Sequence, residues 1–381
     1  MLQADKLELV FSGEDYFSRT LDIIGRSTRQ IRLNTYIFTD DATGAMVIKA
    51  LKDAVARGVN VYVLVDAFGS MSLGSHAIKQ IEEAGINFRK FSPLFVNHHL
   101  RFGRRLHHKI LAGDDKEALI GGINIEDKYR VQGDKTPWLD YAVYVSGPVC
   151  HYITYLCGHF WEGKILRIRP RIRQSYYRKP PISGSTGGID VKILQNDWLY
   201  KREDISRKYR HVVMQAQSSI VILGSYFLPG RRIRNLLRKA AARNVRVQLI
   251  LQGASDVALV QKATTWLYGW MLRNNFEIYE WEKTILHGKM TCIDNNWATV
   301  GSYNVNHLSD YGSIETNVAS HNPDFCASVK KELQRVMDHS VRITYPQYHQ
   351  RMNPFQQFTC WMSFHIMRIL FKLQIALLSR E

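Results

Sequence analysis

Apolar residues occur along the chain in short blocks that alternate with helical segments. The runs Ile31–Phe38 and Val59–Asp66 are nearly continuous in Val, Ile, Leu and aromatic residues, which predicts strands buried on both faces. Between them, residues 46–57 have the apolar spacing of a helix, and Gly58 marks its end. This order of strand, helix and strand predicts a βαβ unit.

The same order occurs again in the second half of the chain. Ile220–Leu228 and Val245–Gln252 are predicted strands, and Arg231–Arg243 is the predicted helix between them. An internal repeat of this kind indicates two similar structural units. We therefore expect an α/β fold of two pseudo-symmetric α/β/α lobes, each with a mostly parallel central sheet flanked by helices.

The repeat suggests a first lobe at residues 1–170, a connector at 171–190, a second lobe at 191–350 and a C-terminal amphipathic helix at 351–381. The connector is predicted from residues 164–188, which carry seven Lys or Arg, no acid, and several prolines and glycines. Its charge could form a basic rim facing an anionic surface, or it could belong to a solvated linker.

The last 24 residues are mostly apolar. His365, Arg368 and Lys372 are spaced by three and four residues, which places them on one helical face. We expect four apolar residues to be turned away from that face: Trp361, Phe364, Ile369 and Leu373. Such a helix can lie in a membrane interface with its cations toward anionic headgroups. The alternative is that it caps the core of the second lobe.

Composition narrows the class of protein. With 45% hydrophobic residues, the 381-residue chain can fill two cores, which excludes general disorder. Five cysteines without C-x-x-C spacing give no disulfide framework or thiolate zinc site. Neither a signal peptide nor a transmembrane helix is expected. The net charge of +17 indicates a polyanionic partner: a nucleic acid, an anionic membrane or a phosphorylated substrate.

One set of residues occurs once in each half with identical spacing, H-x-K-x4-D-x6-G-x2-N. Its members are His107, Lys109, Asp114, Gly121 and Asn124 in the first half, and His287, Lys289, Asp294, Gly301 and Asn304 in the second. Residues i and i+2 of an extended segment face the same side, so each histidine and its lysine point to a common place. If the halves pack about a pseudo-two-fold axis, both histidines face one site.

Such a site suits the chemistry of a phosphodiester. One imidazole can attack phosphorus, the other can protonate the leaving alcohol, and lysine and asparagine donors can bind the phosphoryl oxygens. With two lysines in place, no metal ion or other cofactor is required. A metal site would have to use His98, His99, His107 and His108, but the sequence offers no carboxylate or thiolate at ligand spacing.

The duplicated pattern resembles that of the phospholipase D superfamily, whose members share a two-lobed α/β fold with one active site at the lobe interface. The resemblance extends over about residues 9–342. The run Ile278–Lys289 (IYEWEKTILHGK) and the GGINI segment of the first motif are more narrowly similar to bacterial cardiolipin synthases.

The resemblance implies that His107 forms a phosphohistidine intermediate, and that His287 acts as general acid and then as general base. It implies that several donors bind the substrate phosphate: Lys109, Lys289, Asn124, Asn304 and Ser302. Asp114 and Asp294 complete the catalytic motifs. They fall at an odd offset from the histidines, at the far end of the strand, so we expect their role to be structural.

Each imidazole also needs a group that orients it. Asp140 and Glu315 are candidates, because each lies in an apolar strand downstream of a motif, where a carboxylate without a partner is costly. An ion pair elsewhere is the alternative. The first motif has Gly122 where the second has Ser302, so one hydroxyl near the phosphate is missing from that half.

The resemblance implies phosphatidyl transfer, in which two phosphatidylglycerols give cardiolipin and glycerol. The expected partners are anionic phospholipid and a membrane surface, with the chain peripheral on the cytoplasmic side of the cell membrane. The alternative is a phosphodiesterase that hydrolyses phospholipid or nucleic acid, which the cations of Arg231–Arg243 could bind. A catalytically inactive membrane-binding module is a third possibility, against which both complete motifs argue. The sequence leaves the acceptor alcohol and the oligomeric state open.

Overall fold

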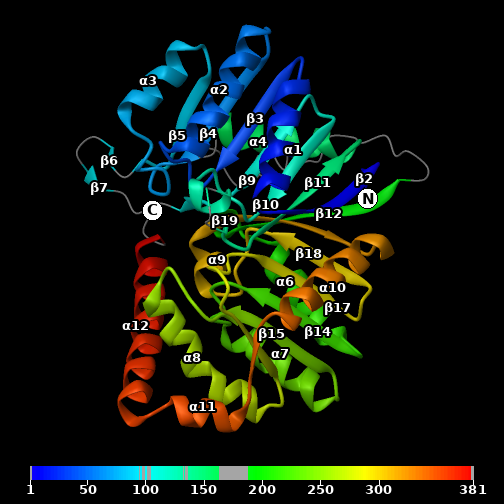
Figure 1. Ribbon diagram of the computed structural model, residues 1–381, viewed down its shortest axis with the longest axis vertical. Coiled ribbons are helices and arrows are strands. Elements are labelled where there is room, and N and C mark those ends of the chain that lie inside the picture. The colour runs from blue at the N-terminus through cyan, green and yellow to red at the C-terminus, as the bar shows by residue number, and fades with distance from the viewer. Residues whose placement is uncertain are drawn as a thin grey trace.

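The chain folds into two lobes, stacked along the long axis of the molecule, each around its own sheet (Figure 1). The computed structural model describes residues 2–93, 95–96, 99–100, 104–131, 133, 136–162 and 188–378. Most of the connector predicted at residues 171–190 lies outside the described residues, so its charge has no structural account.

The two sheets have the same strand order. The first runs β2 (Lys6–Phe11), β11 (Tyr141–Ser146), β10 (Glu117–Gly121), β9 (Lys109–Gly113), β3 (Gln30–Thr35), β4 (Asn60–Asp66), β5 (Asn87–Phe91). The central part of the second runs β12 (Ile189–Asp197), β19 (Ser313–Ser320), β18 (Trp297–Gly301), β17 (Lys289–Ile293), β14 (Ser219–Gly224), β15 (Arg246–Gln252), β16 (Glu277–Trp281). This order confirms the two-lobed α/β fold and its internal repeat.

Only the last three strands of each series are parallel, and the others pair antiparallel. The sheets are therefore mixed, which corrects the expectation of a mostly parallel sheet. The physical reason lies in the motifs. Each supplies two strands, β9 and β10 or β17 and β18, joined by a tight turn, and a tight turn can join only antiparallel neighbours.

Helices cover both faces of the sheets. The outer helices are α1 (Glu14–Arg26), α2 (Ala42–Ala56) and α3 (Ser75–Glu83) in the first lobe, and α6 (Asp204–Gln215), α7 (Arg231–Ala242) and α8 (Ala258–Arg273) in the second. Helices α4 (Val149–Glu162) and α10 (Pro323–Asp338) contribute instead to a core shared by both lobes. Because this shared core is continuous and apolar, it fixes one lobe against the other.

Among the described residues, three backbone pairings also cross between the lobes. Strand β1 (Leu2–Ala4) pairs with β12, strand β8 (Arg105–Leu106) pairs with β19, and Leu139 forms a bridge with Leu286. The last two pairings place the segment just before each motif histidine on the opposite lobe.

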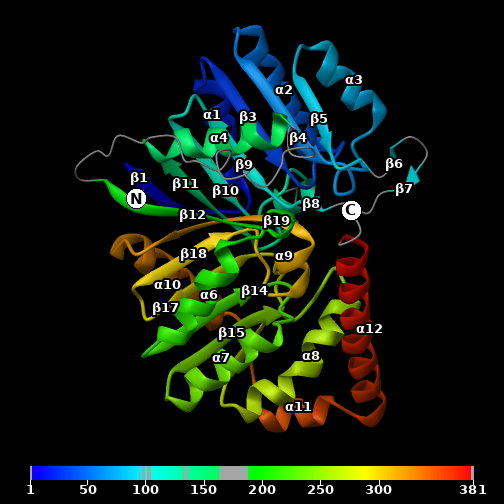
Figure 2. The same cartoon turned by 180° about the vertical axis from the view of Figure 1, so that it is seen from behind.

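The other elements are short or peripheral. They are β6 (Phe95–Val96), β7 (His99–Leu100), β13 (Arg202–Glu203), β20 (Val341–Ile343), α9 (His307–Tyr311), α11 (Tyr345–Arg351) and α12 (Pro354–Leu378), with 3-10 turns at Asp127–Tyr129 and Trp198–Tyr200. Helix α12 lies along the outer edge of the second lobe, and α8 separates it from the sheet (Figures 1 and 2). None of the helices, over the residues described, is long and apolar enough to cross a bilayer.

Candidate active site

Both motif histidines lie at the boundary between the lobes, and the backbone of each is bound to the opposite lobe. The N–H of His107 donates to the carbonyl of Ile314 in β19, at 3.0 Å. The N–H of His287 donates to the carbonyl of Leu139 in the first lobe, at 2.8 Å. Any rotation of one lobe against the other would therefore move a histidine relative to its own motif.

The candidate carboxylates bind the histidines in a crossed arrangement. Nδ1 of His107 lies 2.8 Å from Oε2 of Glu315, and Nδ1 of His287 lies 2.6 Å from Oδ2 of Asp140. Each carboxylate comes directly after the residue whose carbonyl binds the histidine N–H. Both were predicted from the sequence as orienting candidates, but each binds the imidazole of the other lobe and not that of its own motif.

The carboxylates set the tautomer of both rings. A carboxylate can only accept, so Nδ1 carries the proton and Nε2 remains as the reactive nitrogen. Nδ1 of His287 also lies 3.2 Å from the Tyr129 hydroxyl and 2.9 Å from Nζ of Lys289. Neither group can donate to Nδ1 while the Nδ1 proton points at Asp140, and the shorter distance to the carboxylate favours that proton position.

The two motif lysines are buried beside the histidines. Nζ of Lys109 donates to the carbonyl of His107 at 3.2 Å and lies 5.0 Å from the centre of the Tyr36 ring. Nζ of Lys289 donates to the carbonyl of His287. Burial lowers the pKa of Lys109 to about 7 and that of Lys289 to about 8, although Glu315 and Asp140 act in the opposite direction. Two poorly solvated cations at one place form an environment suited to an anion.

Burial also lowers the pKa of both imidazoles. For His107 the charge of Glu315 opposes this effect. For His287 the neighbouring Lys289 lowers the pKa further, and Asp140 opposes it. The two rings are therefore neutral at neutral pH in the unliganded protein, and an anion bound between the lysines would raise both pKa values.

The two motif asparagines use their oxygens within the fold. Oδ1 of Asn124 accepts from the N–H of Ile37 at 3.2 Å, and its Nδ2 donates to the Tyr129 hydroxyl at 2.9 Å. Oδ1 of Asn304 accepts from the Ser225 hydroxyl at 2.8 Å. These bonds fix the orientation of both amides, and each amide nitrogen has two donor hydrogens. A hydrogen therefore remains available on each.

Ser302 binds a carboxylate in the unliganded protein. It is fully buried, and its hydroxyl donates to Oε2 of Glu315. This contact gives the hydroxyl a partner within the fold, and its binding to the substrate phosphate stays a prediction. At Gly122, the equivalent position of the first lobe, an added Cβ would lie 2.2 Å from Oδ1 of Asp140. The first motif lacks a hydroxyl because the carboxylate itself occupies that space.

The motif aspartates lie at the far ends of their strands, as predicted. The Asp114 carboxylate accepts the backbone N–H groups of Thr28, Arg29 and Gln30 at 2.7–2.9 Å. The Asp294 carboxylate accepts the equivalent backbone N–H groups of Gln217, Ser218 and Ser219 at 2.8–2.9 Å. Each aspartate therefore ties the turn of the motif hairpin to the start of a parallel strand, away from the histidines.

Besides Tyr129, two equivalent tyrosines that were not predicted lie against the histidines. The Tyr36 ring is 4.8 Å from the His107 ring, and the Tyr226 ring is 6.0 Å from the His287 ring. Burial raises the pKa of Tyr36 to about 12, so its hydroxyl stays neutral and can donate. A signal was present in the sequence: in each half the tyrosine follows the first strand of the repeat, in Thr35-Tyr36 and Ser225-Tyr226.

A second pair of unpredicted residues holds the chain just before each histidine. Oδ2 of Asp66 accepts the N–H of Leu106 at 2.8 Å, and Nε2 of Gln252 donates to the carbonyl of Leu286 at 2.6 Å. Asp66 and Gln252 end the equivalent strands β4 and β15. A polar residue after the apolar stretch of each strand was the signal in the sequence.

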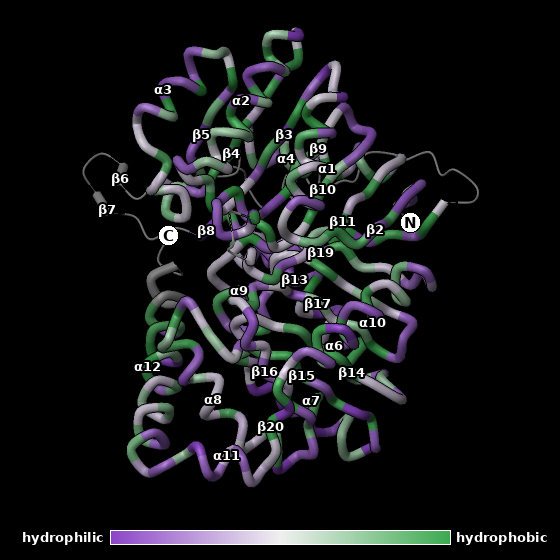
Figure 3. The backbone as a smooth tube through the Cα atoms, in the orientation of Figure 1, coloured by the Kyte–Doolittle hydropathy of each residue, from purple (hydrophilic) through white to green (hydrophobic). Residues whose placement is uncertain are grey.

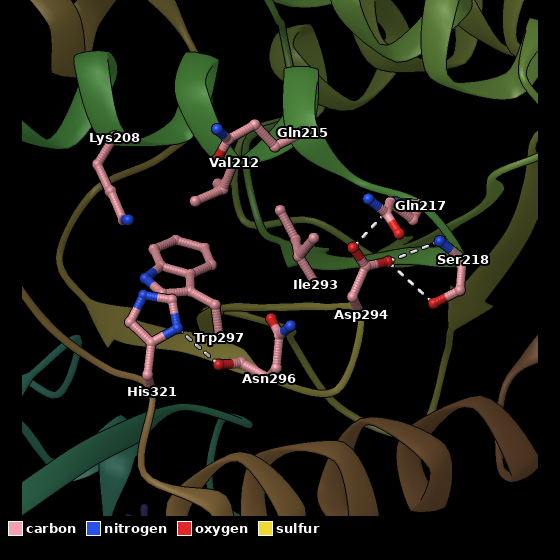
Figure 4. Close-up of a pocket in the computed structure, with 10 residues that line it drawn as sticks. All are labelled: Lys208, Val212, Gln215, Gln217, Ser218, Ile293, Asp294, Asn296, Trp297 and His321. Carbon is pink, nitrogen blue, oxygen red and sulfur yellow. Dashed lines mark hydrogen bonds between the residues drawn. The ribbon is translucent and has the colours of Figure 1, made fainter.

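A hollow of about 650 Å³ lies elsewhere, between the end of α6 and the turn that joins β17 to β18 (Figure 4). Its lining includes Asp294, Trp297, Lys208 and His321 but neither motif histidine. In Figure 4 the Asp294 carboxylate is already bound by Gln217 and Ser218. The hollow is therefore separate from the candidate active site.

Metal-ligating side chains do not gather at the site. Across the described part of the chain, no group of three or more His, Cys, Asp or Glu side chains is arranged to hold a metal ion. Of the four histidines considered for such a site, His98 lies outside the described residues. His108 is buried with its ring 4.9 Å from that of Phe160.

Comparison with known proteins identifies the family of the chain. Residues 20–133 and 209–337 match the family described as cardiolipin synthase, PLD-like domain. The chain is 32% identical over 340 residues to cardiolipin synthase B of Escherichia coli strain K12, covering 88% of this chain and 81% of that one. It is 28% identical to a probable cardiolipin synthase, YwiE, of Bacillus subtilis strain 168, covering 89% and 67%.

Among solved structures, phosphatidylserine synthase of Haemophilus influenzae Rd KW20 superposes with a TM-score of 0.77 at 15% identity, covering 98% of this chain and 96% of that one. Polyphosphate kinase of Porphyromonas gingivalis superposes with a TM-score of 0.61 at 13% identity, covering 97% and 53%. These two similarities concern the fold alone. The family match over both motifs and the 32% identical relative show that the chain belongs to the phospholipase D-like cardiolipin synthase family of phosphatidyltransferases.

Proposed function

We propose that the chain makes cardiolipin from two phosphatidylglycerols, with release of glycerol and with the phosphatidyl group held on a histidine between the two steps. The observation that carries this proposal is the pair of imidazoles, each bound at Nδ1 by a carboxylate of the opposite lobe. Two buried lysines flank them. The family of the chain supports phosphatidyl transfer as the reaction.

In the first step, Nε2 of His107 attacks the phosphorus of the donor phosphatidylglycerol. The bond between phosphorus and the glycerol headgroup oxygen breaks, and protonated Nε2 of His287 gives its proton to that oxygen. Glycerol leaves, and a phosphatidyl group remains on His107. His287 is then neutral and can act as a base.

In the second step, a primary hydroxyl of the acceptor phosphatidylglycerol attacks the same phosphorus. His287 takes the hydroxyl proton as the new P–O bond forms and the P–N bond to His107 breaks. The product is cardiolipin, and His287 is again protonated. If water replaces the acceptor alcohol, the same steps give hydrolysis to phosphatidic acid.

The charges around the site support these roles. The phosphodiester brings one negative charge between Lys109 and Lys289 and relieves their repulsion. The same charge raises the pKa of His287, which needs a proton on Nε2 to act as general acid. We assign the remaining amide hydrogens of Asn124 and Asn304 to the phosphoryl oxygens.

The second candidate function is a phosphodiesterase acting on phospholipid or nucleic acid. Helix α7 supports it with a run of largely exposed cations that could bind a phosphate backbone: Arg231, Arg232, Arg238 and Lys239. Anionic lipid is an equally good partner for these charges. For the chain we propose a peripheral location on the cytoplasmic side of the cell membrane.

The test is incubation of the purified protein with vesicles of labelled phosphatidylglycerol in the presence of a chelator. We expect cardiolipin and glycerol in equal amounts, and none from His107→Ala or His287→Ala. Phosphatidic acid as the sole lipid product would replace transfer with hydrolysis. Cleavage of single-stranded DNA without any lipid product would favour the nuclease.

A phosphodiester with a good leaving group, such as p-nitrophenolate, distinguishes the two histidines. It needs no general acid for the first step. With this substrate we expect His287→Ala to accumulate label on His107, and His107→Ala to retain none. The reverse result would exchange the two roles.

A further inference from the structure

Helix α12 is apolar on two opposite sides, and only one of them is covered. Cys360, Met367 and Phe371 are buried, Phe364 packs against the same core, and the helix lies on α8. Hydrophobic residues nevertheless recur along the helix (Figure 3). The helix is therefore anchored to the second lobe by one side, which fixes the direction of the other.

The uncovered side carries seven large hydrophobic residues. They are Phe355, Phe358, Met362, Ile366, Ile369, Leu370 and Leu373. At 100° per residue these positions fall within one sector of the helix, opposite the buried residues. A contiguous exposed apolar surface of this size on a folded protein marks a contact with another apolar phase.

Cations border this apolar face. Arg368 and Lys372 lie at its edge on the helical wheel, between the buried and the uncovered sides. Near the start of α7, burial lowers the pKa of Arg234, and the charges of Arg368 and Arg231 lower it further. Within the described residues, none of these four cations has a carboxylate within salt-bridge distance. Their charge is therefore available to an external anion.

The carboxyl-terminal end of α12 approaches elements that carry active-site residues. The Phe371 ring lies 6.4 Å from that of His307, which begins α9 three residues after Asn304. In both views this end of α12 lies near the boundary between the lobes (Figures 1 and 2). A membrane surface at this end of the helix would therefore lie near the boundary between the lobes, where the histidines are.

We propose that the uncovered face of α12 docks on an anionic phospholipid bilayer, with its hydrophobic side chains among the acyl chains and Arg368, Lys372 and the start of α7 at headgroup depth. This inference rests on the proposed function, because it presents the active site to phospholipid headgroups. The helix lies in the plane of the interface and does not cross it. Its rigid attachment to α8 transmits that orientation to the whole second lobe.

The test is flotation of the full chain with vesicles of phosphatidylglycerol and phosphatidylcholine, compared with phosphatidylcholine alone. We expect stronger binding to the anionic vesicles. In the double variant Ile369→Glu and Leu373→Glu, binding should fall about tenfold or more, because two inserted side chains become charged. The matched control is Met214→Glu on α6, away from α12, since its exposure of 55% equals that of Leu373 and is close to the 56% of Ile369.

Activity on a short-chain phosphatidylglycerol, present as monomers in solution, separates this inference from the proposed function. We expect the double variant to keep transfer within about twofold of the parent chain on that substrate, because docking is not needed there. Vesicle binding without any transfer by the parent chain would refute the proposed function and leave the docking face standing.

Two results would overturn the inference. One is a double variant that binds anionic vesicles as tightly as the parent chain. The other is a parent chain that sediments as a dimer without lipid and as a monomer when Ile369 and Leu373 are changed. That second result would assign the uncovered face to a second copy of the chain. Circular dichroism of the double variant controls for loss of the helix.

Discussion

Nδ1 of His107 in the first lobe lies 2.8 Å from Oε2 of Glu315 in the second. The reciprocal pair, His287 and Asp140, crosses the boundary in the opposite direction at 2.6 Å. Each lobe therefore supplies the histidine for one pair and the carboxylate for the other. Neither lobe alone contains an oriented imidazole, which explains why a duplicated motif yields one site and not two.

We predict that Glu315→Gln lowers the transfer rate about 10²-fold or more, because the ring loses the partner that fixes its Nδ1 proton. The substituted amide is nearly isosteric, so the change should appear in kcat more than in KM. The pH profile gives a readout that misfolding would not. Loss of a negative charge beside His107 lowers its pKa, so the acid limb of kcat/KM should move to lower pH.

Asp140→Asn is the companion experiment. It should remove the partner that fixes the Nδ1 proton of His287, and it should slow the steps that need a general acid or base. With a p-nitrophenyl phosphodiester, formation of the phosphohistidine should then be nearly normal in Asp140→Asn but slow in Glu315→Gln. Equal effects of both variants on that step would contradict the separate roles of the two histidines.

The equivalent positions Gly122 and Ser302 should respond very differently to exchange. Gly122→Ser places a Cβ 2.2 Å from Oδ1 of Asp140, so the carboxylate must move away from His287 and activity should fall about 10²-fold or more. Ser302→Gly removes a donor to Glu315 and an acceptor for the N–H of Thr316 but leaves the carboxylate beside His107, so it should cost about tenfold or less. The ratio of kcat/KM for the two variants, measured beside their thermal stabilities, checks this asymmetry.

Asp114 should affect stability and not chemistry. Its carboxylate binds three backbone N–H groups far from the histidines, so Asp114→Ala should lower the free energy of unfolding by about 2–3 kcal/mol. Activity per folded molecule should stay within about twofold. Asp22→Ala on the surface of α1 is the control, with an expected change below about 0.5 kcal/mol. A large loss of kcat at normal stability would give Asp114 a direct role in the reaction.

The pH dependence of this contribution follows from the pKa of Asp114. Burial opposes ionisation, but the N–H donors of Thr28, Gln30 and Arg29 outweigh it and lower the pKa. A carboxyl with a lowered pKa stabilises the fold above its unfolded pKa of about 4 and loses that effect as the pH falls through the folded value. The difference in free energy of unfolding between the parent chain and Asp114→Ala should therefore be at its full value at pH 6 and shrink below about pH 4.

The sequence was sufficient to predict the motifs, the two lobes and the identity of the orienting carboxylates, because each leaves a local pattern. The crossing of Asp140 and Glu315 could not be predicted. It depends on β8, only two residues long, pairing with β19 of the other lobe. A strand of two residues has no periodicity, and its partner is chosen by tertiary packing.

Helix α12 shows a second limit of the sequence pattern. The sequence predicted Phe364 on the same apolar side as Trp361, Ile369 and Leu373, turned away from the cations. Phe364 instead packs against the core while the other three are exposed. Apolar residues occur on nearly every side of this helix, so their spacing does not select a buried face. Contact with α8 makes that selection, and it combines the two alternatives left open by the sequence: one side caps the core and the other is uncovered.

Lys109 should lower the stability of the fold while it supports catalysis. Burial lowers its pKa to about 7, against 10.5 for an ordinary lysine, so the folded protein binds fewer protons than the unfolded chain between these values. Stability therefore rises with pH across that window, and the cost of the buried charge is fully present below about pH 7. Lys109→Met removes the cost. It should raise the free energy of unfolding at pH 7 by roughly 1–3 kcal/mol, and the gain should disappear toward pH 10.

The same variant should lose activity, because a donor to the charge that develops on the phosphoryl oxygens is gone. We expect kcat/KM to fall about 10³-fold at pH 7. Lys331→Met, at an exposed position of α10, controls for loss of a lysine without burial and should change neither quantity much. Denaturant unfolding at pH 7 and pH 10 tests the predicted gain in stability, and the transfer assay tests the predicted loss of activity. A destabilised Lys109→Met at pH 7 would mean that its contacts with the His107 carbonyl and the Tyr36 ring outweigh the burial of its charge.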